Sequence, residues 1–167
     1  MPLIKDGALI EDRWTRVADE TPLPDGPVIV SLARWQAERE GLTGRNGALG
    51  ILLASSEAPE AIAEDLDRFD LVCLDFPKFQ DGRAYSHARK LRQRFGYEGE
   101  LRAVGNVLRD QFAFMVRCGF DSFAVADGAV ALQWTRAMDE ISVVYQPAAD
   151  ARATASRQRQ HPAAVDG

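Results

Sequence analysis

The sequence predicts an α/β fold in which a mainly parallel sheet of five to six strands is covered by helices. Short aliphatic and β-branched runs, each the length of a buried strand, alternate with stretches whose apolar residues recur every three or four positions. This alternation is typical of right-handed βαβ units. An open, doubly wound sheet is the preferred arrangement, and an incomplete β/α barrel is the alternative. At 167 residues the chain is long enough to bury one core without metal or disulfide cross-links.

The strands and helices follow one another along most of the chain. The predicted strands are Val28–Ser31, Leu49–Ala54, Leu71–Phe76, Leu101–Val104, Ser122–Val125 and Ile141–Tyr145. The predicted helices cover residues 32–40, 57–67, 84–95, 107–118 and 129–138. Asn106 is expected to cap the helix at 107–118. Because that helix is apolar nearly all round, it should be central or, in a homo-oligomer, lie at a subunit interface.

Two segments flank the region of alternating strands and helices. Residues 3–17 alternate around a turn-forming Asp6-Gly7 pair, which predicts a β-hairpin. Residues 147–167 are rich in Ala, Arg and Gln without apolar periodicity, which predicts a flexible tail. We therefore expect a single α/β domain over residues 1–146, hairpin included.

Composition excludes several classes of protein. No apolar run approaches the roughly 20 residues that a membrane-spanning helix needs. The N-terminus has no basic segment followed by an apolar core, so nothing resembles a secretory signal and a cytoplasmic location is expected.

Cofactor motifs are missing from the sequence. Cys73 and Cys118, with His87 and His161, are too few to hold an iron–sulfur cluster or a closed zinc site. Neither of the glycine-rich nucleotide-binding patterns GxGxxG and GxxxxGK[ST] occurs. No flavin, NAD, iron–sulfur or metal site is therefore predicted, and the cofactor, if there is one, is unknown.

The charge is unevenly distributed. The net charge is -5, yet residues 78–109 hold 8 basic and 3 acidic side chains. A basic stretch in an acidic protein fits a small anion or an acidic protein surface better than nucleic acid, which usually selects a basic domain. A merely solvated helix face is the plain alternative.

Two predicted strands end in polar segments, and ligands of parallel sheets bind beyond such carboxyl ends. Asp75 and Lys78 follow one strand and are the candidate catalytic residues, with Asp75 as an acid–base carboxylate. Arg83, Asn106 and Arg109 are the candidate anion-binding residues, because arginines and a helix start can surround one oxyanion. Sulfite, phosphate and carboxylate all fit, whereas a turn-capping role is the structural alternative for Asp75.

The helix predicted at 84–95 offers a second kind of surface. Ala88 and Leu91 should face the core, which leaves the basic side chains largely in solvent. Such a surface suits docking of a partner better than a pocket. The candidate partner-binding residues are Arg89, Lys90, Arg92 and Arg94.

These polar segments carry a resemblance to a known family. The segment 75–86, Asp-Phe-Pro-Lys-Phe-Gln-Asp-Gly-Arg-Ala-Tyr-Ser, together with residues 105–111 and 117–123, resembles a bacterial domain family of unknown function. Members of that family carry the label of an oxidoreductase involved in sulfite reduction. Asn106 stands where aspartate is expected in the family motif, which keeps a helix cap but removes a charge.

The resemblance implies a place beside sulfite reductase and the sulfate-activation enzymes in sulfur assimilation and cysteine biosynthesis. Whether the protein catalyses a reaction stays open. The preferred hypothesis is an accessory protein that docks on sulfite reductase or its electron donor through the basic helix. The alternative is a small oxyanion-binding enzyme or oxidoreductase with its site at the strand ends. Flavin or nicotinamide binding without a standard motif is a third, weaker hypothesis.

Overall fold

The computed structural model describes residues 2–78, 80–126 and 133. Within them an eight-stranded sheet has the order β2-β1-β8-β7-β6-β5-β4-β3. Its centre consists of parallel neighbours in chain order: β4 (Val28–Ser31), β5 (Leu49–Leu53), β6 (Leu71–Phe76), β7 (Glu100–Gly105) and β8 (Ser122–Ala124). The predicted α/β class and mainly parallel sheet are therefore confirmed.

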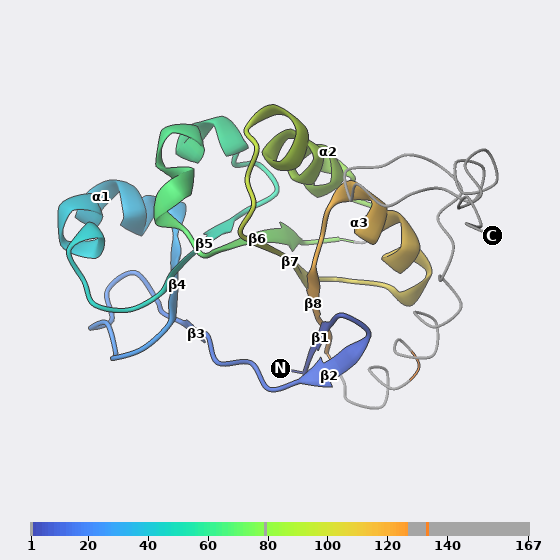
Figure 1. Cartoon of the computed structure of the whole chain (residues 1–167), viewed down its shortest axis with the longest axis horizontal. Coiled ribbons are helices and arrows are strands. Elements are labelled where there is room, and N and C mark those ends of the chain that lie inside the picture. The colour runs from blue at the N-terminus through green and yellow to red at the C-terminus, as the bar shows by residue number, and fades with distance from the viewer. Residues whose placement is uncertain (1, 79, 127–132, 134–167) are drawn as a thin grey trace, which may run out of the picture.

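The helices all lie on one side of this sheet (Figure 1). They are α1 (Leu32–Thr43), η1 (Pro59–Arg68), α2 (Arg83–Arg89), η2 (Lys90–Arg94), η3 (Arg109–Gln111) and α3 (Phe112–Cys118). A doubly wound sheet reverses its strand order and so places helices on both faces. Here the strand order does not reverse, and the sheet curls into a half-barrel, which corresponds to the alternative arrangement rather than the preferred one.

The strand number also differs from the predicted five to six, because the N-terminal segment joins the same sheet. β1 (Leu3–Lys5) pairs antiparallel with β2 (Ala8–Ile10) and with β8. Asp6 and Gly7 have φ angles of 50° and 80°, the positive values that a two-residue hairpin turn requires. The hairpin is thus confirmed over residues 3–10. β3 (Thr15–Arg16) instead leaves it and pairs parallel with β4 at the opposite edge.

The segment between β2 and β3, residues 11–14, crosses the side of the sheet that carries no helices (Figure 1). We call this side the helix-free face. Its buried centre is formed by Ile29, Leu71 and Cys73, with Trp14 packed against it. A Cβ on Gly50 would lie 3.1 Å from the Trp14 ring, so the missing side chain makes room for the indole. The larger core lies on the helix side.

An ionic network fastens residues 11–14 to the sheet. Arg102 of β7, only 2% exposed, donates to both carboxylate oxygens of Asp12 at 3.0 Å. It also donates to Glu100 at 2.9 Å, and Glu100 accepts from Ser122 and Lys5 at 2.6 Å each. Because every charge in this network has a partner, burying it is tolerable.

Several helices differ from the regular α-helices that the periodicity predicted. η1, which begins at Pro59, is a 3-10 helix, and the helix predicted at 84–95 continues beyond Arg89 as the π-helical turn η2. None of the helices in the described part of the chain is long and apolar enough to cross a membrane. The predicted helix 129–138 (apart from Gln133), the predicted strand Ile141–Tyr145 and the predicted tail lie outside the described residues.

Candidate functional site

The polar segments after β6 and β7 meet, as their sequence positions predicted. Phe76 and Gly105 are register partners at the ends of these strands. The backbone N–H of Asn106 donates to the Phe76 carbonyl at 2.7 Å, and its side-chain amide donates to the Pro77 carbonyl at 2.8 Å. The two loops therefore form one continuous rim at the carboxyl edge of the sheet.

Asn106 does not cap a helix, contrary to the sequence-based expectation. Gly105 has a φ of 89° and turns the chain so that the Val107 N–H bonds to the Gly105 carbonyl at 2.9 Å. The amide of Asn106 is committed to Pro77, and helical structure begins only at Arg109. Residue 106 therefore ties two loops together instead of offering free N–H groups to an anion.

Gly105 is required at its position. A Cβ there would lie 2.6 Å from Asp75 Oδ1 and 2.6 Å from the Phe76 carbonyl oxygen. Gly105→Ala should therefore lower the free energy of unfolding by about 1–3 kcal/mol, measured by denaturant titration. Gly41→Ala is the control, because a Cβ on Gly41 meets nothing within 4 Å and alanine favours the helix. A Gly105→Ala protein as stable as the wild type would contradict this account of the rim.

Asp75 lies half-buried on the helix-free face, beside its register partner Val104. Throughout the described chain its carboxylate takes part in no hydrogen bond or ion pair. Burial raises the pKa of Asp75; Arg16 partly opposes this rise, and the negative charge of Asp81 adds to it. A half-buried carboxylate with a raised pKa and no partner is typical of a functional group, and Asp75 keeps its predicted role as a candidate acid–base residue.

A stability measurement can check the state of Asp75. Its pKa is higher in the folded than in the unfolded chain, so its contribution to stability is present at low pH and is lost as the pH rises through the folded pKa. Asp75→Asn should therefore raise the melting temperature near neutral pH and lose this advantage below about pH 3.9, the usual aspartate pKa. Equal melting temperatures of Asp75→Asn and the wild type at every pH would show that folding does not raise the pKa of Asp75.

Arg83 is occupied by neighbours rather than free for an anion. Its guanidinium donates to Asp81 at 2.9 and 2.7 Å and to the hydroxyl of the buried Ser55 at 3.0 Å. Hydrogen bonds from Arg83 and from Ser55 hold the pKa of Asp81 well below its usual range. Arg83 thus links the loop after β6 to the loop after β5, and no hydrogen bond joins it to Asn106 in the described residues.

The two remaining candidates of the strand-end site are exposed. The side chains of Lys78 and Arg109 make no hydrogen bond or ion pair within the part of the chain that the structure describes. No contact brings either of them to Arg83 or Asn106. Anion binding by Lys78 and Arg109 stays a prediction.

Of the four candidate partner-binding residues, Arg92 has a structural role and the other three lie at the surface. Arg92 does not lie in solvent as expected: it is 13% exposed and donates to the carbonyls of Tyr97, Gly99 and Gly119 and to Asp121. It connects the π-helical turn to two other segments of the chain, residues 97–99 and 119–121. Lys90 and Arg94 lie near Glu60, at 2.8 and 3.6 Å.

Arg89 belongs to an aromatic surface that the sequence analysis did not single out. Its guanidinium lies 5.4 Å from the ring centre of Phe114 on α3, and Tyr85 meets the same ring edge-on at 4.9 Å. Phe114 is 40% exposed and Leu108 is 44% exposed. The apolar pattern of residues 107–118 predicted a helix that is central or lies at a subunit interface, and it did not show which of its side chains are exposed.

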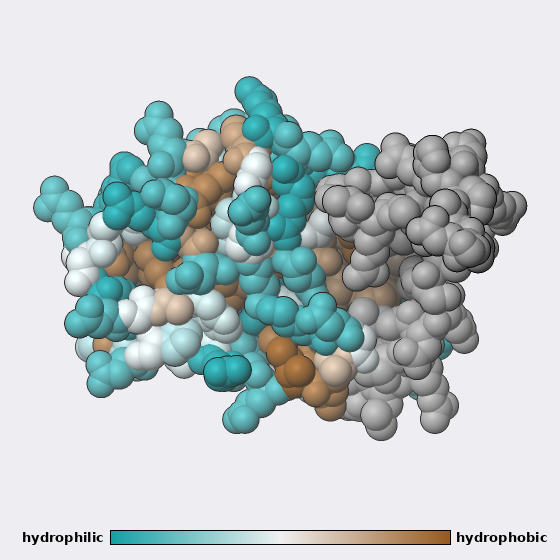
Figure 2. Space-filling model, viewed as in Figure 1, coloured by the Kyte–Doolittle hydropathy of each residue, from teal (hydrophilic) through white to brown (hydrophobic). Residues whose placement is uncertain are grey.

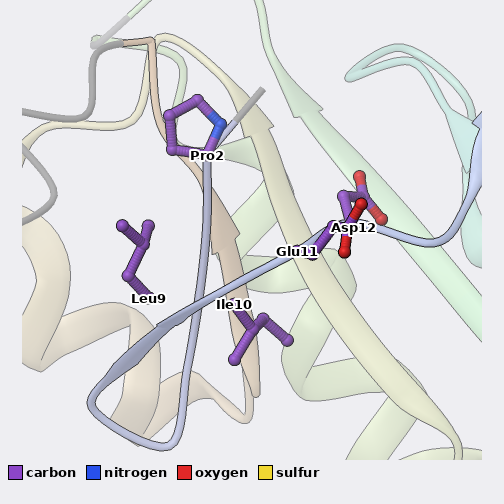
Figure 3. A pocket seen from close by; sticks show the side chains of 5 residues that line it. All are labelled: Pro2, Leu9, Ile10, Glu11 and Asp12. Atoms are coloured by element: carbon purple, nitrogen blue, oxygen red, sulfur yellow. The ribbon is translucent and has the colours of Figure 1, made fainter.

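A groove of about 440 Å³ lies elsewhere, beside the edge strand β2 (Figure 3). Pro2, Leu9, Ile10, Glu11 and Asp12 line it. Figure 2 shows an apolar patch where Figure 1 places β2, consistent with exposures of 46% for Leu9 and 39% for Ile10. None of the candidate residues from the sequence lies in this groove.

The described residues contain no group of three or more His, Cys, Asp or Glu side chains arranged to hold a metal ion. Cys73 and Cys118 are both buried, and burial raises the pKa of each thiol. Neither is therefore an activated thiolate.

Comparison with models of known protein families identifies the family of the chain. Residues 50–156, more than half of the chain, match the sequence profile of a family described as bacterial protein of unknown function (DUF934). No curated protein matches the chain. The matched region begins at β5 and includes both loops of the rim and the surface around Arg89.

Proposed function

The chain belongs to this bacterial protein family of unknown function, and we propose that it is an accessory protein of assimilatory sulfite reduction. It docks on sulfite reductase, or on the electron donor of that enzyme, through a surface formed by α2, η2 and α3. The pathway rests on the resemblance of residues 75–86, 105–111 and 117–123. The docking surface rests on the side chains around Phe114.

The observation that supports docking most strongly is the stacking of Arg89 on the exposed ring of Phe114. Exposed aromatic rings combined with arginine are enriched at the energetic centres of protein interfaces. Tyr85 also packs edge-on against this ring, so the ring is held in place before the partner binds. A preordered anchor loses less conformational entropy on binding.

The charge of this surface indicates an acidic partner. Residues 83–94 contain five arginines and lysines and no acidic residue. Glu60 is the partner of both Lys90 and Arg94, so one carboxylate faces two cations and the local charge stays positive. Attraction between such a surface and an acidic patch speeds association and weakens as salt is added.

Affinity capture tests the proposal in the native host, grown with sulfate as the sole sulfur source. The docking variant is Arg89→Glu/Arg94→Glu. The control, Arg13→Glu/Arg68→Glu, makes the same change in net charge on exposed arginines outside the surface. Sulfite reductase subunits should be recovered with the wild type and the control and be lost with the docking variant. Equal recovery with all three proteins, or recovery with none, would refute the proposal.

The aromatic anchor can be tested without changing charge. Phe114→Ala should weaken binding to the captured partner about tenfold, which corresponds to about 1.4 kcal/mol. The circular dichroism spectrum of the variant should match that of the wild type, because Phe114 is 40% exposed. Binding of full strength by a folded Phe114→Ala protein would remove this residue from the interface.

A further inference from the structure

One acidic side chain, Glu60, lies against the cations of the proposed docking surface. Its carboxylate accepts a hydrogen bond from the ammonium group of Lys90 at 2.8 Å and lies 3.6 Å from the guanidinium of Arg94. Glu60 belongs to η1 and precedes Lys90 by 30 residues, so folding and not local helix spacing makes this contact. Residues 83–94 contain no acidic residue. The fold therefore supplies the basic surface with a carboxylate that its own segment lacks.

The contact is open to solvent. Glu60 and Lys90 are each 41% exposed, and Arg94 is 67% exposed. Exposed ion pairs contribute little to stability, because water and salt screen the charges and two long side chains lose conformational freedom. Glu60 can therefore leave the two cations at small cost to the fold. A carboxylate of another molecule that reaches the same cations can take its place.

Glu60 is charged under ordinary conditions. The hydrogen bond from Lys90 is the main cause that lowers the pKa of Glu60, and the positive charges of Lys90 and Arg94 lower it further. At neutral pH the carboxylate therefore partly neutralises both cations. It also repels any acidic surface that approaches them. An acidic partner must overcome both effects before it can use Lys90 and Arg94.

The contact lies beside the aromatic anchor of the docking surface. α2 runs between η1 and α3 (Figure 1). Arg89 contacts Phe114 on α3, and the next residue, Lys90, contacts Glu60 on η1. A partner that packs on Phe114 and extends across α2 would therefore bring its own side chains to the position that Glu60 occupies.

We propose that Glu60 competes with the partner, and that an aspartate or glutamate of the partner replaces Glu60 on Lys90 and Arg94 when the complex forms. The inference rests on the proposed function, since it concerns the same docking surface. It assigns to the partner a carboxylate next to an apolar side chain that packs on Phe114. Because Glu60 opposes acidic surfaces in general, only a partner that places a carboxylate on this pair of cations recovers what the displacement costs.

Glu60→Gln tests the competition. Glutamine keeps the size of the side chain and removes its charge. In calorimetric titrations with purified sulfite reductase and, separately, with its electron donor, Glu60→Gln should bind about three to ten times more tightly than the wild type. Asp67→Asn is the matched control, because it removes the same charge from η1 at a residue that is 78% exposed and pairs with Arg68 at 3.8 Å. It should change the affinity less than about twofold.

A second background separates competition from a general effect of charge. In Lys90→Met the pair that Glu60 closes is already broken, so Glu60→Gln should tighten binding by a smaller factor there than in the wild type. Thermal melting shows that each variant is folded.

Three results would overturn the proposal: binding by Glu60→Gln that is no tighter than that of the wild type, an equal gain in Asp67→Asn, or the same gain in the Lys90→Met background. Wild-type binding distinguishes this failure from that of the proposed function. If wild type and Glu60→Gln both bind neither protein, the proposed function fails and the competition fails with it. If the wild type binds and the Glu60 comparison fails, the docking proposal stands alone.

Discussion

Replacement of Arg102 by methionine is expected to lower the free energy of unfolding by about 3–5 kcal/mol, the usual cost of removing one member of a buried ion pair. The methionine side chain is unbranched like that of arginine, but it carries no charge. It therefore leaves two carboxylates, Asp12 and Glu100, without their main cation. Glu100 keeps Lys5 and Ser122 as partners, while Asp12 loses the Nη1 group that donates to both of its carboxylate oxygens. Residues 11–14 should then detach from the helix-free face.

Denaturant titration measures this loss, and proteolysis locates it. Cleavage in residues 11–14 should become faster in Arg102→Met than in the wild type, because Asp12 fastens this segment. Arg13→Met, which removes an exposed arginine from the same segment, should change stability by less than about 0.5 kcal/mol. An Arg102→Met protein of unchanged stability would mean that the network does not hold the segment in place.

Replacement of Arg92 by methionine is expected to be the second most damaging change. Three carbonyl groups, from Tyr97, Gly99 and Gly119, would lose a donor, and each buried acceptor left without one costs about 1–3 kcal/mol. The ion pair with Asp121, whose carboxylate also accepts from the Leu101 N–H, would be lost as well. We expect a total loss of at least about 2 kcal/mol.

Arg94→Met provides the matched comparison for Arg92. Arg94 is 67% exposed and reaches Glu60 only at 3.6 Å, so its loss should cost less than about 0.5 kcal/mol. The two variants therefore separate structure from docking: Arg92→Met should unfold at lower denaturant, and Arg94→Met should weaken only partner binding. Similar stability for both would place Arg92 on the surface, as its sequence position had suggested.

Local sequence patterns predicted the central strands well, because a buried strand needs a continuous apolar run wherever it lies in the sheet. β4, β5, β6 and β7 begin and end within one residue of their predicted bounds. The arrangement of the sheet was harder, since apolar periodicity does not say which side of the sheet a crossover helix covers. The curled half-barrel and the departure of Thr15–Arg16 from the hairpin depend on pairings between distant segments.

The candidate site, like the sheet, was predictable where it depends on the ends of the central strands. That the loops after β6 and β7 meet follows from parallel strands ending at one edge, and Asp75 was found for this reason. Arg92 was wrongly assigned to the solvent-exposed side of its helix, because helical spacing cannot show that it donates to the carbonyl groups of residues 97, 99 and 119.

The most direct test of the proposed function is a calorimetric titration of the purified protein with purified sulfite reductase and, separately, with its electron donor. The account predicts saturable binding to one of them that weakens with added salt and is lost in Arg89→Glu/Arg94→Glu but not in Arg13→Glu/Arg68→Glu. No binding to either protein, or binding that ignores both salt and the docking variant, would contradict it.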